Sequence, residues 1–192
     1  MLIMQSYKEQ VARWPRTGRH LLAHYTTESI VVYQAYRPSI AQWAIEHQEF
    51  GGPEFSFSRM SWVKPSFLWM MFRSNWGRKV GQQSVLAVHL LQDGFNQILA
   101  ATSGVRVQRD PDHDPSGKPV FRRTIQLGLR AKMLQRYAKD WIVQIEDISE
   151  LVATQREKSL SELETPREEI YPVQDKDVVN KLGIDPLPVN QL

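Results

Sequence analysis

The sequence predicts an α+β fold and not a doubly wound parallel sheet. Short β-branched and aromatic runs are interspersed with stretches of helical spacing, but they do not follow a regular strand–helix–strand alternation. Two of these runs, 105–108 and 124–127, enclose a segment dense in turn-forming residues, which predicts a hairpin. The chain has 192 residues, of which 42% are hydrophobic and 23% charged, so it is long enough for one real core.

In the first half, residues 30–36 are β-branched and aromatic and predict a buried strand. A helix is expected from Pro38, because apolar residues then recur at helical spacing until the glycines at 51–52. Residues 55–63 alternate between apolar and polar and predict a second strand. Pro65 begins a second helix, in which residues 67–72 form an apolar run that predicts core packing.

In the second half, residues 84–91 predict the central strand. We expect a turn at Asp93-Gly94 and a short helix at 95–101, which are followed by the predicted hairpin. The remaining expected elements are a helix at 130–139, a last strand at 141–145 and a closing helix at 151–160.

The expected organisation is a single α+β domain over residues 1–160 and an acidic, proline-containing tail over 161–192 that extends across the body. Residues 1–150 carry 19 Lys and Arg against 13 Asp and Glu, a net charge of +6, whereas 151–192 carry 5 against 8, a net −3. A basic body favours an anionic partner, a nucleotide or a nucleic acid, but it is equally typical of an ordinary protein surface. The sequence leaves the oligomeric state open.

Composition excludes several classes of site. The chain has no cysteine, which excludes disulfides, thiolate catalysis and cysteine–zinc sites. No segment is long and apolar enough to span a bilayer, and the first residues lack the order of a signal peptide. These features predict a cytoplasmic location and no membrane partner.

Metal and phosphate-loop motifs are also missing. His20 and His24 are four residues apart, and Asp112-His113-Asp114 is a small cluster, but neither has a third partner at the spacing of a metal site. The chain contains neither a G-x-G-x-x-G motif nor a phosphate loop. The sequence therefore predicts no metal.

Residues 58–66 form the most unusual stretch, with two cations, three hydroxyls and an indole in front of an aromatic helix. Arg59 and Lys64 are suited to phosphates, Ser58 and Ser61 to hydrogen bonds, and Trp62 to stacking on a base or a nicotinamide ring. The alternative is a polar strand edge with Trp62 in the core.

Three further positions are candidates. Arg37 follows a strand and precedes a helix, so it and the helix amides are placed to hold a phosphate, although a surface arginine would give the same pattern. Gln108 and Asp110 share one side of a strand end, as a ribose-orienting pair or as a hairpin shoulder. Gln126 lies within an apolar frame, where an amide is hydrogen-bonded either to backbone or to a ligand.

Several of these stretches together resemble the family catalogued as domain of unknown function 4291. The resemblance rests on VYQAY at 32–36, RMSWVKPSFLWMM at 59–71, and further pieces at 40–41, 106–108, 110–111, 125–129 and 141–143. These pieces run in order from about residue 19 to 152 and cover most of the chain.

The resemblance implies a grouping by fold near the ADP-ribosyltransferases, and with it a split, mostly antiparallel sheet with flanking helices that holds NAD in its cleft. In such enzymes a first strand supplies a basic residue, a second strand a hydroxyl, and a later strand a glutamate or glutamine. By position, the residues that would bind NAD are Tyr36, Arg37, Ser58, Arg59, Ser61, Trp62 and Lys64. The residues that would be catalytic are Gln126, Gln108 and Asp110. NAD would be a substrate, and a nucleic acid is an alternative ligand or an acceptor. The third hypothesis is that the protein is a catalytically inactive scaffold, which binds a protein partner.

Overall fold

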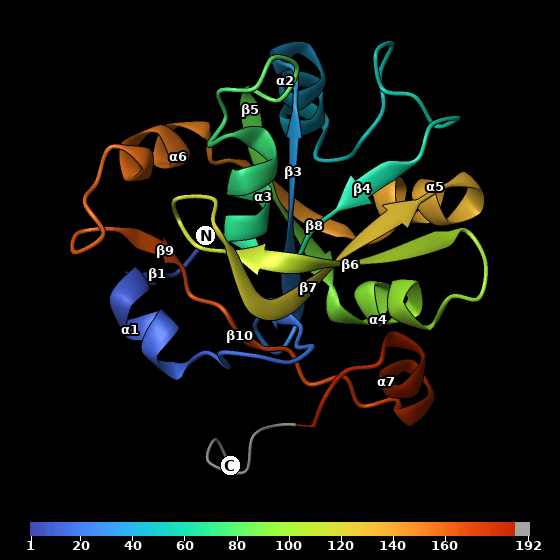
Figure 1. Ribbon diagram of the computed structural model, residues 1–192. Coiled ribbons are helices and arrows are strands. Elements are labelled where there is room, and N and C mark those ends of the chain that lie inside the picture. Colours follow the sequence, from blue (N-terminus) through green and yellow to red (C-terminus); the bar gives the residue numbers. More distant parts are fainter. Residues whose placement is uncertain (187–192) are drawn as a thin grey trace.

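Two three-stranded antiparallel sheets form the centre of the computed structural model, which describes residues 1–186 (Figure 1). The first sheet has the order β3 (Ser29–Tyr36), β5 (Ser84–Leu91), β8 (Ile142–Asp147). The second has the order β4 (Ser61–Val63), β7 (Pro119–Leu129), β6 (Val105–His113). An antiparallel bridge between Tyr33 and Lys64 joins β3 to the end of β4, so the sheets meet there. The predicted α+β class with antiparallel sheets is confirmed.

Helices cover both faces of the first sheet. They are α2 (Pro38–His47), α3 (Phe67–Ser74), α4 (Gln92–Ala100), α5 (Ala131–Lys139) and α6 (Ser149–Arg156). Alternate side chains of β3 enter two different hydrophobic clusters, with Ile30 and Val32 in one and Val31 and Tyr33 in the other. This alternation is the consequence of a two-residue period in a strand that is buried on both faces.

The helix α3 contributes to the core as predicted. Phe67 to Met71 are all buried, and the hydroxyl of Ser66 accepts a hydrogen bond from the Trp69 amide at 3.3 Å as an N-cap. Phe72 differs from the prediction, because 45% of its surface is exposed. Its ring stacks on His113 of the hairpin, with centroids 3.7 Å apart.

The predicted strand over 55–63 is wrong for most of its length, since only Ser61–Val63 pair with another strand. Phe55 and Phe57 instead gather in a loop, where Phe55 packs against Phe50 at 5.3 Å and Phe57 against Phe55 at 5.0 Å. An aromatic cluster and an alternating strand give the same sequence pattern over so few residues.

The turn predicted at Asp93-Gly94 is also wrong, because helix α4 already begins at Gln92. Gly94 lies under the ring of Trp141, and a Cβ atom there would meet Trp141 Cγ at 2.3 Å. The glycine is therefore explained by a close approach of two elements and not by a turn.

The hairpin has longer strands than the sequence indicates, and its turn is only residues 114–118. Pro111 lies inside β6, which is tolerated because β6 is the edge strand of its sheet. Asp114 closes the turn by accepting hydrogen bonds from the amides of Ser116 and Lys118 at 2.9 and 3.0 Å.

The two ends of the chain pair with one another around the body. Strand β1 (Met4–Ser6) pairs with β9 (Glu164–Pro166), and β2 (Leu22–Ala23) pairs with β10 (Glu169–Ile170). Each of these terminal segments also contains a helix, α1 (Tyr7–Arg13) in the first and α7 (Lys176–Leu182) in the second. The strand around 141–145 is thus not the last one, and the segment after 160 includes regular structure as far as α7. Residues 187–192 of the expected tail lie outside the described residues.

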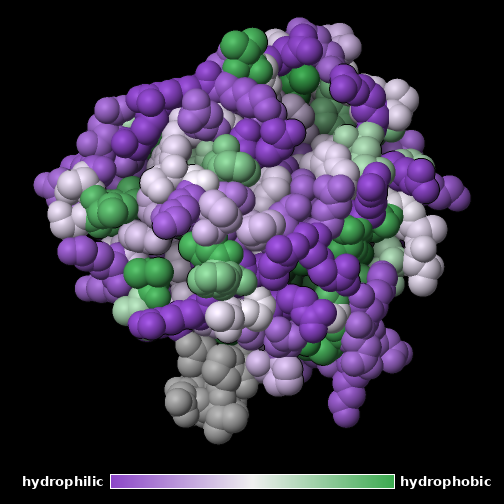
Figure 2. Space-filling model, viewed as in Figure 1, coloured by the Kyte–Doolittle hydropathy of each residue, from purple (hydrophilic) through white to green (hydrophobic). Residues whose placement is uncertain are grey.

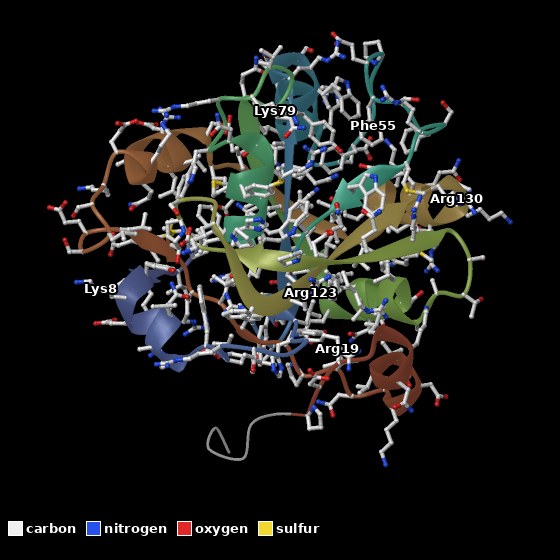
Figure 3. All side chains as sticks on the ribbon, viewed as in Figure 1. Lys8, Arg19, Phe55, Lys79, Arg123 and Arg130 are labelled. Atoms are coloured by element: carbon white, nitrogen blue, oxygen red, sulfur yellow. The ribbon has the colours of Figure 1, made fainter. Side chains whose placement is uncertain are left out.

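Helix α7 is attached to the second sheet by hydrogen bonds and an ion pair. Arg109 donates to the carbonyls of Leu182 and Lys181, each at 2.8 Å, and Arg19 pairs with Asp185 at 2.8 Å. Arg19 and Arg123 lie close together above this helix in Figure 3, in agreement with a bridge between their backbones.

A buried charged cluster fixes the chain ends to α3 and the hairpin. Arg122 and Asp112 are 5% and 2% exposed and are 2.5 Å apart between Nη2 and Oδ2. Arg122 also donates to the Pro15 carbonyl at 2.9 Å. Nearby, buried Glu168 accepts a 2.6 Å hydrogen bond from the Phe67 amide, and burial holds the pKa of its carboxyl well above the ordinary value. We call Asp112, Arg122 and Glu168 the charged cluster.

The outer surface is mostly polar. In the face shown in Figure 2, hydrophilic residues predominate and apolar residues form small separate groups. None of the helices within residues 1–186 is long and apolar enough to cross a membrane.

Candidate functional site

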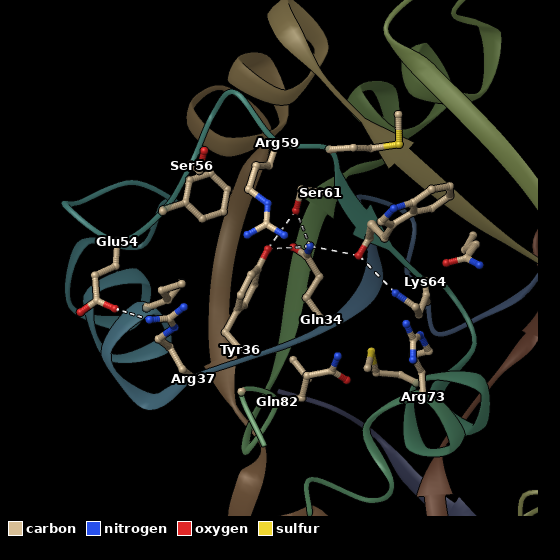
Figure 4. A pocket seen from close by; sticks show the side chains of 18 of the residues that line it. Gln34, Tyr36, Arg37, Glu54, Ser56, Arg59, Ser61, Lys64, Arg73 and Gln82 are labelled. Atoms are coloured by element: carbon tan, nitrogen blue, oxygen red, sulfur yellow. Dashed lines mark hydrogen bonds and ion pairs between the residues drawn. The ribbon is translucent and has the colours of Figure 1, made fainter. Parts of the chain in front are cut away.

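A polar pocket of about 480 Å³ lies where the two sheets meet (Figure 4). Its walls come from the end of β3, the loop before β4, strand β4, helix α3 and the hairpin. Its polar lining residues are Gln34, Tyr36, Arg37, Glu54, Ser56, Arg59, Ser61, Trp62, Lys64, Arg73, Gln82, Gln108 and Gln126. Segments distant in sequence thus converge on one cavity.

Most of the candidates from the sequence lie in this pocket. Its lining includes Tyr36, Arg37, Arg59, Ser61, Trp62, Lys64, Gln108 and Gln126. Two candidates do not line it. Ser58 is exposed and hydrogen-bonded to Ser56 at 2.9 Å, and Asp110 lies behind Gln126.

A hydrogen-bonded network forms the rear wall. Tyr137 donates to Gln34 Oε1 at 2.6 Å, and Gln34 Nε2 lies 2.9 Å from both Tyr36 Oη and Ser61 Oγ. Tyr36 and Ser61 are themselves 2.9 Å apart, and burial raises the pKa of Tyr36 to about 12. Because their partners are fixed, these two hydroxyls are held in place as neutral hydrogen-bonding groups.

Two polar side chains of the hairpin, Gln108 and Gln126, form a second wall, and Asp110 holds Gln126 from outside the lining. Gln126 Nε2 donates to Gln108 Oε1 at 2.9 Å and to Asp110 Oδ2 at 2.8 Å. Gln108 and Gln126 are direct cross-strand partners. The amide of Gln126 is therefore oriented by other side chains, a third possibility beyond the backbone or ligand partners expected from the sequence.

The ring of Trp62 lies beside the hairpin because position 128 is glycine. A Cβ at Gly128 would meet Trp62 Cη2 at 3.0 Å and Met60 Sδ at 2.5 Å. Trp62 is only half-buried and borders the pocket, so it is not a core residue.

Cations outnumber carboxylates in the lining. Arg37 pairs with Glu54 at 3.1 Å, and both side chains are largely exposed. Arg59 and Arg73 are also exposed, and neither takes part in an ion pair within the part of the chain that the structure describes. The pocket is therefore an electropositive site, suited to an anion.

Lys64 is the buried cation of the pocket, with 5% of its surface exposed. Its Nζ donates to the Trp62 carbonyl at 3.3 Å and lies 5.2 Å from the centroid of the Trp69 ring. Burial lowers the pKa of Lys64 to about 7, with a further lowering by Arg73 and a partial offset by Asp110.

Sequence reasoning missed five polar residues of the pocket, which are Gln34, Glu54, Ser56, Arg73 and Gln82. Gln34 had a detectable signal, since it is a buried amide within an apolar strand, as Gln126 is within its own frame. The other four had none. Arg73 lies in the last turn of α3, and Glu54, Ser56 and Gln82 lie in loops, so they become part of the site only through tertiary packing.

The clusters considered for metals have other partners. His24 Nδ1 is 2.9 Å from the Arg167 carbonyl, Asp112 is paired with Arg122, and His113 stacks on Phe72. Among residues 1–186, no group of three or more His, Asp or Glu side chains is arranged to hold a metal ion.

The fold and the pocket define an α+β protein with an electropositive cavity at the junction of two antiparallel sheets. The profile of the family described as Domain of unknown function (DUF4291) matches residues 20–104 and 100–175, and the chain belongs to this family. These ranges contain every residue of the pocket lining. No curated protein and no solved structure matches the chain.

Proposed function

We propose that the pocket binds NAD and that the protein is an ADP-ribosyltransferase-like enzyme, which transfers ADP-ribose to an acceptor. The observation that carries the proposal is the convergence of three strands on one pocket. Strand β3 brings Tyr36 and Arg37, β4 brings Ser61, and β7 brings Gln126. Residue types and strand order agree with the basic, hydroxyl and glutamine positions that the resemblance implies.

The split of the sheet supports the same proposal. The six central strands lie in two sheets, with the spatial orders β3-β5-β8 and β4-β7-β6, and the Tyr33–Lys64 bridge joins these sheets. The pocket is lined by Gln34 and Lys64 beside this bridge, and such a junction is where a split-sheet enzyme would bind NAD.

The charges of the pocket suit a diphosphate. The ion pair of Arg37 with Glu54 is exposed and therefore weak, and Arg59 and Arg73 take part in no ion pair among residues 1–186, so all three guanidinium groups are available for phosphate oxygens. Trp62 offers a half-buried indole for stacking on a ring of the dinucleotide.

The reaction would break the bond between the ribose carbon and the nicotinamide nitrogen, so that nicotinamide leaves with the bonding electron pair. Positive charge then builds on the ribose until the acceptor attacks that carbon and loses its proton. Gln126 Nε2 is engaged by Gln108 and Asp110, which leaves Oε1 to accept a hydrogen bond from a ribose hydroxyl. The Asp110 carboxylate behind it would favour the developing positive charge.

The direct test is to incubate the purified protein with NAD and to measure released nicotinamide and ADP-ribose adducts by mass spectrometry. We expect Gln126→Ala to lower nicotinamide release about 100-fold or more, as the loss of a preorganised polar group does. Arg37→Ala should abolish turnover with a nearly unchanged melting temperature, since its ion pair is exposed.

Two exposed residues outside the pocket lining, Gln135 and Arg16, provide matched controls as Gln135→Ala and Arg16→Ala. Both variants should retain wild-type release. Normal release in Gln126→Ala and Arg37→Ala, or no release together with no NAD-dependent thermal shift, would overturn the proposal.

A nucleic-acid-binding function is the second candidate. It is favoured by the exposed ring of Phe72, which stacks on buried His113 and directly precedes the pocket residue Arg73 in α3, so that an aromatic surface lies next to a cation. Affinity for a single-stranded oligonucleotide should then fall steeply between 50 and 200 mM salt. An affinity that is flat over this range would rule this candidate out.

A further inference from the structure

The side chain of Lys64 is held in one place by its backbone and its surroundings. Its amide and carbonyl both pair with Tyr33, at 3.3 and 2.7 Å, at the point where the two sheets meet. The Nζ atom is then confined between the Trp62 carbonyl and the ring of Trp69. A lysine on a free surface would not be ordered in this way.

This amine has no carboxylate partner. Within residues 1–186, none of the ion pairs involves Lys64, although the side chain is almost completely buried. Buried lysines are normally paired, because an isolated buried ammonium is costly. Within the described part of the chain, the one polar contact of the amine is a 3.3 Å hydrogen bond to a carbonyl, which a neutral amine can also make.

The amine nevertheless borders the pocket. Figure 4 shows Lys64 at the wall between Ser61 and Arg73, with its nitrogen turned toward the Trp62 carbonyl. Arg73 on α3 is the nearby cation and Asp110 on β6 the nearby anion. Burial is the main reason why the uncharged amine is favoured. The positive charge of Arg73 acts in the same direction, and the carboxylate of Asp110 opposes both.

We infer that Lys64 is an amine nucleophile, which condenses with the carbonyl carbon of a small anionic aldehyde bound in the pocket. The Nζ lone pair attacks the carbonyl carbon, and the carbonyl oxygen takes up a proton to give a carbinolamine. Loss of water then gives the imine, so one C=N bond replaces one C=O bond without oxidation or reduction. Arg59 and Arg73 hold the anionic group of the aldehyde.

A lysine with these surroundings is activated in the way that known imine-forming lysines are, by desolvation and by a neighbouring cation. A pKa of about 7 makes a large fraction of Lys64 uncharged at neutral pH. An exposed lysine with a pKa near 10.4 is uncharged in less than about one molecule in a thousand. The inference does not rest on NAD cleavage, because a protein that never binds NAD would show the same reactivity.

The experiment uses pyridoxal 5′-phosphate as an anionic aldehyde, borohydride to fix the imine, and peptide mass spectrometry to locate the label. We expect Lys64 to be labelled at pH 7 at least 10-fold faster than exposed Lys132 and Lys79 of the same molecule. The labelling rate of Lys64 should rise with pH, with a midpoint near pH 7.

Two comparisons test whether the labelling of Lys64 depends on an anionic group in the aldehyde. Pyridoxal, which lacks the phosphate, should label Lys64 at least 10-fold more slowly than pyridoxal 5′-phosphate. Arg73→Gln should reduce this difference and move the midpoint of Lys64 labelling to higher pH, because a neighbouring positive charge is removed. Arg16→Gln, at an exposed arginine outside the lining, should change neither.

Labelling of Lys132 and Lys79 without labelling of Lys64 would overturn the inference, and so would a Lys64 midpoint near pH 10. Equal labelling by the two aldehydes would overturn the assignment of the anionic class. Lys64→Arg, which keeps the charge but not the nucleophile, should lose the label while its melting temperature confirms that it is folded.

Discussion

The pocket and the charged cluster both contain buried ionisable groups next to α3, but only the charged cluster pairs its buried cation with a carboxylate among residues 1–186. In the charged cluster, Arg122 meets Asp112 at two nitrogen atoms, 2.5 and 3.0 Å away, and its third nitrogen donates to a carbonyl. In the pocket, Lys64 is as deeply buried as Arg122 but has no carboxylate partner among residues 1–186.

This difference separates a structural site from a candidate functional one. The charged cluster links the hairpin, α3 and both chain ends, so its satisfied hydrogen bonds serve the fold. The pocket leaves buried and half-buried polar groups incompletely paired, which costs stability unless a ligand supplies the missing partner. Substitutions in the two regions should therefore have opposite effects on stability.

The largest effect is expected from Asp112→Asn in the charged cluster. This change leaves the Arg122 guanidinium buried without its counter-charge, and removal of one partner of such a pair costs about 3–5 kcal/mol of unfolding free energy. Urea unfolding would measure it. Asp185→Asn, in the exposed pair with Arg19, is the matched control and should cost about 1 kcal/mol or less.

Lys64→Met should act in the opposite direction. It replaces an unpaired buried amine by an apolar side chain of similar length, and Gln34 still donates to the Trp62 carbonyl. We expect a gain of about 1–2 kcal/mol at pH 6. Because the folded pKa of Lys64 is lowered to about 7, wild-type stability should rise as pH increases above 7, and the advantage of the variant should shrink.

Exposed Lys132 provides the control as Lys132→Met, which should change stability by less than about 0.5 kcal/mol at every pH. A Lys64→Met variant that is less stable than wild type at pH 6 would mean that the amine is paired in solution.

Glu168→Gln probes titration within the charged cluster. The folded pKa of Glu168 lies above its usual value, so the folded state binds the proton more tightly and stability falls as pH rises from about 4.5 toward the folded pKa. The amide oxygen of glutamine can still accept from Phe67, so the variant should lose this slope, which is at most about 1.4 kcal/mol per pH unit.

Thermal unfolding between pH 5 and 8, with exposed Glu164→Gln as the control, would detect the change in slope. An unchanged slope in Glu168→Gln would show that the carboxylate is stabilised in its charged form by the nearby Arg122.

The smallest effect is expected from Arg73→Gln. Arg73 is exposed and takes part in no ion pair within the described residues, so its loss should change stability by less than about 0.5 kcal/mol. A denaturant titration beside Arg16→Gln would establish this. A loss above 1 kcal/mol would show that Arg73 belongs to the fold and not to the pocket.

Local patterns in the sequence were sufficient for the long buried elements. The strand around 30–36 and the helix from Pro38 were predicted almost to the residue, since apolar period and a proline start are encoded locally. Polar residues within apolar frames were equally informative, and Gln126 was singled out for this reason. The same signal was present at Gln34 but was not used.

Contacts between distant segments decided the rest. Gly94 was taken for a turn because its reason, the ring of Trp141, lies 47 positions away in the chain. Phe55 was assigned to a strand because its packing against Tyr36 at the end of β3, 19 positions earlier, is not visible in the local alternation. Arg73 was overlooked because nothing near it in sequence marks it as part of a site.

By itself, the sequence determined the α+β class, the main buried elements and the residue types available for an anion-binding site, because these depend on local period and composition. Only the tertiary structure decided which cations have partners. Arg122 and Lys64 are both basic residues in mixed polar and apolar surroundings, yet one lies against a carboxylate and the other beside an open pocket. Burial and pairing depend on what the whole chain brings into contact, and local sequence does not encode that.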